Sequence, residues 1–412
     1  MRQASAVGAL LAACLPGLAG AVDVQARAKL FGTAQALPSH DLQRRLDRTP
    51  AYDGSADFRL MLRHTVGSVT ILADHALTLV SGDSHGLLQA LQPILDQSPA
   101  GDGRRMVNLT WDIESGARHR SWGRVDRLAV QHRLKDWSLT LGRQAVSWGN
   151  GMVFAPMDLF NPFAPTTVDR DYKAGDDLFL AERLLANGAD LQLLAVARRD
   201  ERGRRTGQAA STALKWHGFV GRLEFDLLAA KHYRDQVFGG GFRWPLGVAL
   251  LRSDLVATRL RDGGWRLSGL LNADVSLTVA GRNAYLFAEY FHNGFGVAKL
   301  PPMAEPLPSP LAQRLSRGEV FNPMRDYLAV GGNLEWHPLV NQALTLIGNL
   351  NDGSVLLQTS VTHERGDHQR LQLGIVTPIG QSGKEFGGIP VFGDRATSGG
   401  GQTLFMRWVY YF

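Results

Sequence analysis

The feature that most limits the fold of this chain is an alternation of apolar and polar residues with a period of two. In residues 220–233, for example, Leu223 and Phe225 alternate with Glu224 and Asp226. Successive side chains of a β-strand point to opposite faces, so this pattern predicts a strand with one apolar and one polar face. Because the pattern recurs along most of the 412 residues, we expect an all-β protein.

The alternating segments number about 18, a count that suits a large barrel, although about 16 strands would also fit. They are residues 57–64, 68–80, 108–114, 123–134, 137–145, 178–185, 189–198, 209–216, 220–233, 238–244, 248–260, 265–277, 284–295, 327–336, 343–350, 354–364, 369–377 and 402–412. Residues 22–31 also alternate, and we assign residues 22–55 to an N-terminal arm or an extra strand. Residues 84–97 instead have the spacing of one helical face, which predicts a helix on the side of the short turns.

The first residues indicate export. Arg2 precedes an apolar run over residues 6–15, and small residues end at Ala21, which together predict a signal peptide over residues 1–21 that is cleaved near Ala21. An alternative is lipoprotein processing, which would leave a lipidated Cys14. No later stretch reaches the ~18 consecutive apolar residues of a membrane-spanning helix, so any membrane would have to be crossed by strands.

A soluble sandwich and a membrane barrel can share this alternation, but further features favour the barrel. Charged residues recur in the middle of the predicted strands, as a polar lumen requires. The chain also ends with Trp408, Tyr410 and Phe412 on one face, which is typical of an aromatic girdle at a membrane interface. We therefore predict that residues 56–412 form a single transmembrane antiparallel β-barrel in the outer membrane of a Gram-negative bacterium.

One long segment, residues 141–177, interrupts the strands. Its prolines and glycines disfavour both a strand and a long helix, yet it carries Trp148 and Phe154, which a solvated linker would lack. We expect this central loop to fold into the pore or across its mouth, and the alternative is an ordinary surface loop. Counting strands places it on the external side, together with the long loops at residues 299–323 and 380–401.

Two stretches carry a resemblance to known proteins. The final Trp408-Val409-Tyr410-Tyr411-Phe412 resembles the C-terminal assembly signal of bacterial outer-membrane barrels. A second set of residues is similar to a motif of large porin-like barrels related to alginate-export proteins: Gly142-Arg143-Gln144, Ser147-Trp148-Gly149, Phe154, Pro156, Asp158-Leu159-Phe160-Asn161-Pro162 and Glu289-Tyr290-Phe291-His292-Asn293-Gly294. The resemblance implies a single outer-membrane barrel that passes or exports solutes.

The polar strand faces predict a charged lumen. Its basic members are expected to be Arg59, Arg63, Arg127, Arg133, Arg222, Arg252 and Arg407, and its acidic members are Glu224, Asp254 and Glu289. The central loop adds Asp169, Arg170, Asp171 and Lys173 as a mixed-charge constriction. Arg143 either lines this constriction or pairs with a loop carboxylate as a structural residue. The surplus of arginines predicts a mild preference for anions.

These features favour an outer-membrane channel or exporter for small anionic or polar solutes. The net charge of +6 suggests an anionic partner, but a secreted chain without a basic run does not suit nucleic acid. The expected partners are outer-membrane lipid, the barrel-assembly machinery and small solutes. No cofactor and no metal site are predicted.

Two other functions stay open. One is a structural or partner-binding barrel. The other is a lipid-acting enzyme, because Gly82-Asp83-Ser84-His85 matches the start of a lipase motif. That family pairs its serine with an Asp-x-x-His sequence, and none of the 12 histidines follows an aspartate by three residues.

Overall fold

A computed structural model of the chain describes residues 22–46, 49–87, 102–169, 171–301, 305–391 and 396–412. Several predictions lie outside these residues and are not tested. They are the signal peptide, the lipidation of Cys14, the larger part of the helix over residues 84–97, and the position of Arg170.

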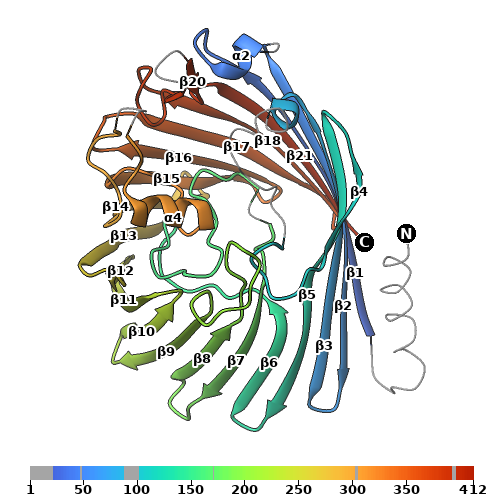
Figure 1. Cartoon of the computed structure of the whole chain (residues 1–412), viewed down its shortest axis with the longest axis vertical. Coiled ribbons are helices and arrows are strands. Elements are labelled where there is room, and N and C mark those ends of the chain that lie inside the picture. Colours follow the sequence, from blue (N-terminus) through green and yellow to red (C-terminus); the bar gives the residue numbers. More distant parts are fainter. Residues whose placement is uncertain (1–21, 47–48, 88–101, 170, 302–304, 392–395) are drawn as a thin grey trace.

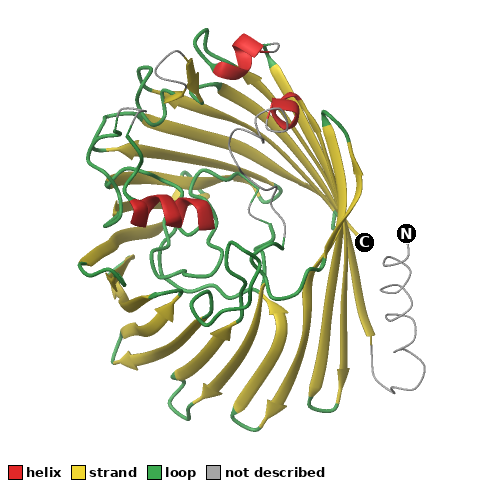
Figure 2. Ribbon diagram, viewed as in Figure 1, coloured by secondary structure: helices red, strands yellow, loops and turns green. Residues whose placement is uncertain are grey.

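The described residues form one antiparallel sheet that closes on itself (Figures 1 and 2). The strands are β1 (Val22–Ala36), β2 (Ala51–Val66), β3 (Val69–Gly82), β4 (Thr110–Ser115), β5 (His119–Leu134), β6 (Trp137–Gln144), β7 (Asp176–Leu184), β8 (Asp190–Val196), β9 (Ser211–Val220), β10 (Leu223–His232), β11 (Asp235–Leu246), β12 (Ala249–Arg259), β13 (Trp265–Val279), β14 (Arg282–His292), β15 (Asp326–His337), β16 (Val340–Asn349), β17 (Val355–Arg365), β18 (Gln369–Ile379) and β21 (Gln402–Tyr411). Because β1 pairs with both β2 and β21, the barrel is closed. It has 18 strands, as predicted.

Two segments need comment: residues 22–55 were predicted to form an N-terminal arm or an extra strand, and residues 108–114 a strand of the barrel. Residues 22–31 belong to β1, a barrel strand paired along both edges, so the barrel begins at Val22 rather than at residue 56. Residues 108–114 overlap β4, which has only 6 residues and pairs with the half of β5 that lies nearer the long connections. The half of β5 nearer the short turns pairs with β6 instead. β4 therefore extends the rim of the barrel and does not span the height of its wall. The two changes cancel in the strand count.

The alternation separates the two faces of the barrel wall. On β12 and β13, Leu255 and Leu271 point outward and are 54% and 55% exposed, whereas Asp254 and Asn272 point inward and are buried. The same alternation places the C-terminal aromatic residues outward: Phe412 packs edge-on against Tyr410 with ring centroids 4.7 Å apart. An apolar outer belt and polar inner positions are the arrangement that a barrel in a lipid bilayer requires.

The two ends of the barrel differ. Tight turns, such as those after Val66, Leu134 and Leu246, join strands at one end, and the long connections lie at the other. The long connections carry the helices α2 (Leu42–Leu46) and α4 (Ser309–Arg317) and the two-stranded sheet of β19 (Ile389–Val391) and β20 (Ala396–Ser398). Neither described helix is long and apolar enough to cross a membrane.

Only the start of the helix predicted over residues 84–97 is described, and it lies at the opposite end of the barrel from the one expected. Residues 83–87 are helical and follow β3, which is the third strand of the barrel and not the second. Its place shifts because β1 takes part in the wall. The central loop between β6 and β7 does lie inside the barrel, where Figure 2 shows it crossing the enclosed space.

Candidate functional site

The candidate site is the central loop, residues 145–175, together with the inward-facing side chains that it meets. The loop begins at the end of β6 and reaches the middle of β12, about 100 residues further along the chain. There the Asp254 carboxylate accepts hydrogen bonds from the Asn150 backbone N–H at 2.8 Å and from Asn150 Nδ2 at 2.7 Å. Asp254 is 1% exposed, so this contact is a fixed attachment between loop and wall.

A second attachment follows on β14. The Glu289 carboxylate accepts three consecutive backbone N–H groups of the loop, from Met152 at 2.6 Å, Val153 at 3.1 Å and Phe154 at 2.7 Å. Asn272 on β13 donates a further bond at 3.1 Å. Glu289 is fully buried, and backbone amides that converge on one carboxylate stabilise its charge without a basic partner.

Apolar packing reinforces this first half of the loop. Trp148, Met157 and Phe160 lie in one cluster with inward-facing residues of β7 to β12. Phe154 stacks on Phe291 of β14 with ring centroids 4.5 Å apart. A solvated loop would leave these large side chains exposed at a cost of about 1.5–3 kcal/mol each. The prediction that the loop packs against a barrel wall is therefore confirmed in its geometry.

Lys173 joins the end of the loop to its beginning. Its ammonium group donates to the Val146 carbonyl at 2.5 Å and to both carboxylate oxygens of Asp158, at 2.7 and 2.5 Å. Burial raises the pKa of the Asp158 carboxyl to about 6, although the Lys173 ammonium opposes that shift. Burial also lowers the pKa of Lys173. Lys173 was predicted to face solutes in a constriction; it instead holds the loop closed.

The second half of the loop meets a charged part of the wall. Asp169 forms an ion pair with Lys29 of β1. Asp171 forms ion pairs with Arg407 of β21 and with Arg27 of β1, the latter at 3.4 Å. Both loop carboxylates are thus bound to basic side chains at mid-strand.

Tyr172 continues this contact onto the next strands. Its ring lies 3.6 Å from the Arg59 guanidinium of β2 and 4.5 Å from that of Arg127 on β5. Arg59 also pairs with Asp126 at 2.7 Å, and Arg127 donates to a loop carbonyl at 2.5 Å. The predicted residues Arg59, Arg127 and Arg407 therefore do gather at one site.

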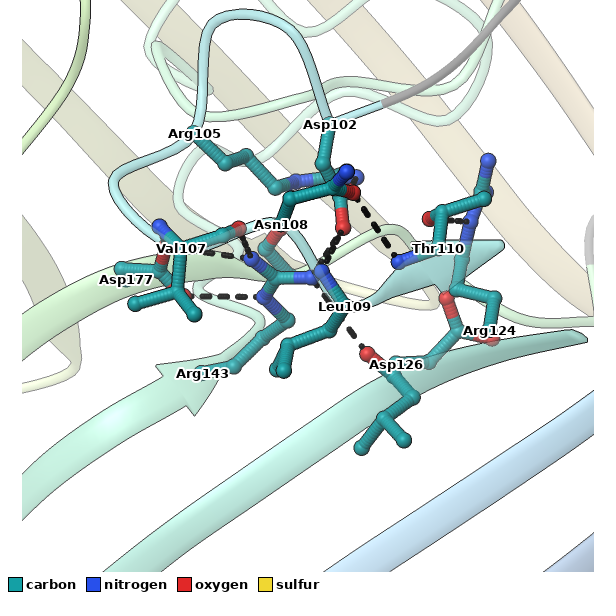
Figure 3. Close-up of polar contacts among 12 residues, drawn as sticks. Asp102, Arg105, Val107, Asn108, Leu109, Thr110, Arg124, Asp126, Arg143 and Asp177 are labelled. Carbon is teal, nitrogen blue, oxygen red and sulfur yellow. Dashed lines mark hydrogen bonds and ion pairs between the residues drawn. The ribbon is translucent and has the colours of Figure 1, made fainter. Parts of the chain in front are cut away.

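Of the two roles expected for Arg143, the contacts of its side chain fit the structural one. The residue is 2% exposed. Its Nε donates to Asp177 at 2.8 Å, its Nη1 to Asp102 at 2.8 Å and its Nη2 to the Val107 carbonyl at 2.6 Å (Figure 3). Burial alone would raise the pKa of Asp102, but hydrogen bonds from Arg143 and Arg105 outweigh it and hold the pKa at about 2. Arg143 thus ties both ends of the central loop to residues 102–109.

The other predicted lumen residues do not join the site. Arg252 pairs with Asp274 at 2.8 Å, and Glu224 pairs with Arg243 at 3.2 Å, both away from the end of the loop. Arg63, Arg133 and Arg222 lie near the short turns and are exposed. Arg222 sits in the turn between β9 and β10, since the alternation that predicted its strand does not mark where a strand begins.

Sequence reasoning missed several residues of the site. These are Arg27, Lys29, Asp57, Asp126, Asn150, Asp158 and Tyr172. Arg27 and Lys29 lie on the polar face of residues 22–31, so a strand assignment there would have placed both in the lumen. The sequence held no comparable signal for the loop residues, because their partners lie on distant strands.

A buried polar chain connects the outer loops near β8 to β11. Arg198 donates to Ser211 at 2.9 Å, the Ser211 hydroxyl lies 3.0 Å from His232 Nδ1, and His232 Nε2 lies 3.1 Å from a carboxylate oxygen of Glu319. Serine, histidine and glutamate in contact raise the question of an esterase. Ser211 is 1% exposed and its oxygen already accepts from Arg198, so this array holds loops together.

The comparisons support the fold and leave the family open. No family model matches the chain. No curated protein is similar to it in sequence. The resemblance to alginate-export-like barrels is therefore not confirmed.

Solved structures are similar to the chain over almost its whole length. Pseudomonas aeruginosa OccK5 (OpdH) aligns with a TM-score of 0.53 at 10% identity, covering 95% of this chain and 98% of that chain. OccK11 (OpdR) of the same organism gives 0.53 at 11% identity, with 95% of each chain covered. OpdK solved with vanillate gives 0.50 at 10% identity, covering 95% and 98%. At this identity the likeness shows the fold alone.

Proposed function

We propose that the chain is an outer-membrane channel that passes small polar solutes, with a weak preference for anions. The observation that carries this proposal is the central loop. It lies inside a closed barrel, it is attached to the wall at Asp254 and Glu289, and it brings charged side chains to basic residues at mid-strand. A loop built into a lumen with charges at its end is suited to screening solutes by size and sign.

The similar structures agree with this proposal. OpdK, by its description, is an outer-membrane protein solved with vanillate, which carries a carboxylate. For the present chain, the basic residues Arg27, Arg59 and Arg407 favour anions, while Asp57, Asp126 and the loop carboxylates offset them. Only a weak preference is therefore expected.

The proposed location is the outer membrane of a Gram-negative bacterium, reached after signal-peptide cleavage near Ala21. Outer-membrane lipid would contact the apolar outer belt. The barrel-assembly machinery would recognise the aromatic side chains that point outward at the end of the last strand, which are Trp408, Tyr410 and Phe412. Changing Tyr410 and Phe412 to Ala should lower the assembled fraction, measured as heat-modifiable protein in outer-membrane preparations.

Planar-bilayer recording of the purified protein tests the function. We expect discrete conductance steps and a reversal potential in a KCl gradient that lies slightly on the anion side. Absence of conductance in every condition would favour a structural or partner-binding barrel. Turnover of lipid esters by the pure protein would favour the enzyme. The lipase-like Ser84 offers little support for an enzyme, since it lies in the short helical segment after β3 and its hydroxyl donates to Asp53 at 2.6 Å.

A further inference from the structure

We propose that Arg27, Arg407 and Lys29 form a carboxylate-binding site in the lumen, and that Asp169 and Asp171 of the central loop are its tethered occupants. A small dicarboxylate would bind by exchanging with these two loop side chains. The inference rests on the proposed channel function, and it adds a solute class and the residues that select it.

The geometry provides two neighbouring places for carboxylates. Arg27 and Arg407 lie on the adjacent strands β1 and β21 and both contact the Asp171 carboxylate. Lys29 lies two residues from Arg27 on the same face of β1 and holds Asp169. Guanidinium and ammonium groups are the usual protein ligands of carboxylates, and here two carboxylates already occupy them.

The charges of the wall leave room for an anion. In the ion-pair network of the described residues, the wall contributes four basic side chains and two acidic ones; the basic ones are Lys29, Arg27, Arg59 and Arg407, and the acidic ones are Asp57 and Asp126. Asp57 is shared by Arg27 and Arg59. Within that network Arg407 and Lys29 pair only with the loop. The surplus of two positive charges equals the two charges that Asp169 and Asp171 supply.

The loop carboxylates satisfy the site incompletely. The Nε atoms of Arg27 and Arg407 are buried and have no hydrogen-bond partner among the described residues, and the same is true of Asp169 Oδ1. A bound solute with well-placed oxygens can use donors that the loop leaves unused. Free donors of this kind distinguish the site from the attachment at Glu289, whose carboxylate accepts four bonds.

The ion pairs of Asp169 and Asp171 are also more accessible to water than the attachments of the loop at Asp254 and Glu289. The side chains of Asp169 and Asp171 are 27% and 15% exposed, whereas Asp254 and Glu289 are 1% and 0% exposed as residues. Water that reaches these ion pairs lowers the cost of breaking them. Since the occupants are two carboxylates on adjoining cations, a solute with two carboxylates on a short chain can replace both at once, and its second contact is then intramolecular.

The test compares wild type with the variant Asp169→Asn/Asp171→Asn in planar bilayers, using succinate as the probe. We expect the succinate concentration that half-blocks the chloride current to fall about tenfold in the variant, because the tethered competitors are gone. Butyrate, which has the same number of carbons and one carboxylate, should change less. The reversal potential of the variant should move toward anions. Glu201→Gln/Asp262→Asn is the control, since it makes the same charge change at exposed loop positions.

The outcomes separate this inference from the proposed function. Conducting channels in which succinate blocks wild type and variant equally would overturn the inference and leave the channel intact. If neither conducts, the channel function fails, and calorimetry of succinate binding in detergent decides the site: tighter binding to the variant supports it, and no binding to either overturns it. Should the double variant not assemble, Asp169→Asn alone should strengthen succinate binding and Lys29→Gln should weaken it. The opposite order would overturn the proposal.

Discussion

The two halves of the lumen wall hold the same loop in different ways. From β7 to β16 the wall carries two clusters of buried apolar side chains, and the loop is attached there by packing against them and by the carboxylates of Asp254 and Glu289. From β21 through β1 to β5 the inward positions include many charged side chains, and the loop meets them through ion pairs of its partly exposed carboxylates Asp169 and Asp171. Buried contacts of the first kind fix a position, whereas ion pairs whose carboxylates water can reach are more easily exchanged.

The largest effect on how the loop is held is expected from removing its fixed attachment on β14. Glu289→Ala leaves the N–H groups of three loop residues without their acceptor in a buried site, at an expected cost of about 3–5 kcal/mol. The loop should then detach, which limited proteolysis within residues 150–160 would detect, along with noisier single-channel currents. Glu224→Ala is the control: it removes a half-exposed inward carboxylate and should cost under about 1 kcal/mol. Equal protease resistance in Glu289→Ala and wild type would contradict the account.

A somewhat smaller effect is expected from the apolar packing. Phe154→Ala removes the ring that stacks on Phe291, and a buried Phe→Ala change costs about 3 kcal/mol or more. The temperature at which the folded band disappears on a gel should fall. Phe321→Ala, in the outer loops, starts from a side chain that is 39% exposed and should lower it far less. Equal shifts for the two variants would show that the loop packs loosely.

The contact between Asp158 and Lys173 should depend on pH. The pKa of Asp158 is about 6 in the folded protein, above its usual value of 3.8. Between these two pH values the carboxyl is therefore mostly protonated in the folded state and mostly ionised in the unfolded state. This group's contribution is therefore complete below about pH 4 and is lost as the pH rises through about 6, with a size of about 2–3 kcal/mol. The urea midpoint of wild type relative to Asp158→Asn should rise as the pH falls from 7 to 4. A constant difference across that range would contradict the assignment.

The smallest effect is expected at the short-turn end. Changing Arg63, Arg133 and Arg222 together to Gln removes three exposed cations that lie away from the loop, and the reversal potential should shift by only a few millivolts, because exposed charges are screened within about 10 Å. The variant Arg27→Gln/Arg407→Gln removes only two cations, yet it should shift the reversal potential more than the triple change does. The reverse order would place the selective region at the turns.

Period-two alternation predicted the strands and their inward and outward faces. Mid-strand charges and the terminal aromatic residues were needed to favour a membrane barrel, and the apolar residues of the proline-rich stretch predicted the lumenal loop. The predicted number of strands is right through two differences that offset each other, because β4 alternates over six residues without crossing the wall, while residues 22–31 were assigned to an arm or an extra strand and form β1. The partners of the loop could not be predicted. Asn150 and Asp254 are 104 positions apart, and Asp171 and Arg407 are 236 apart, so only closure of the barrel brings them together.

The most direct test of the account is the single-channel conductance of a barrel that lacks the loop. Residues 151–167 would be replaced by a short Gly-Ser linker, with Glu289→Gln and Lys173→Gln, because the deletion removes the amides that bind Glu289 and the Asp158 carboxylate that binds Lys173. We predict a conductance well above that of wild type, while the same linker in place of the exposed residues 201–205 leaves it unchanged. A correctly assembled, heat-modifiable variant whose conductance and selectivity equal those of wild type would contradict the claim that the central loop narrows the pore.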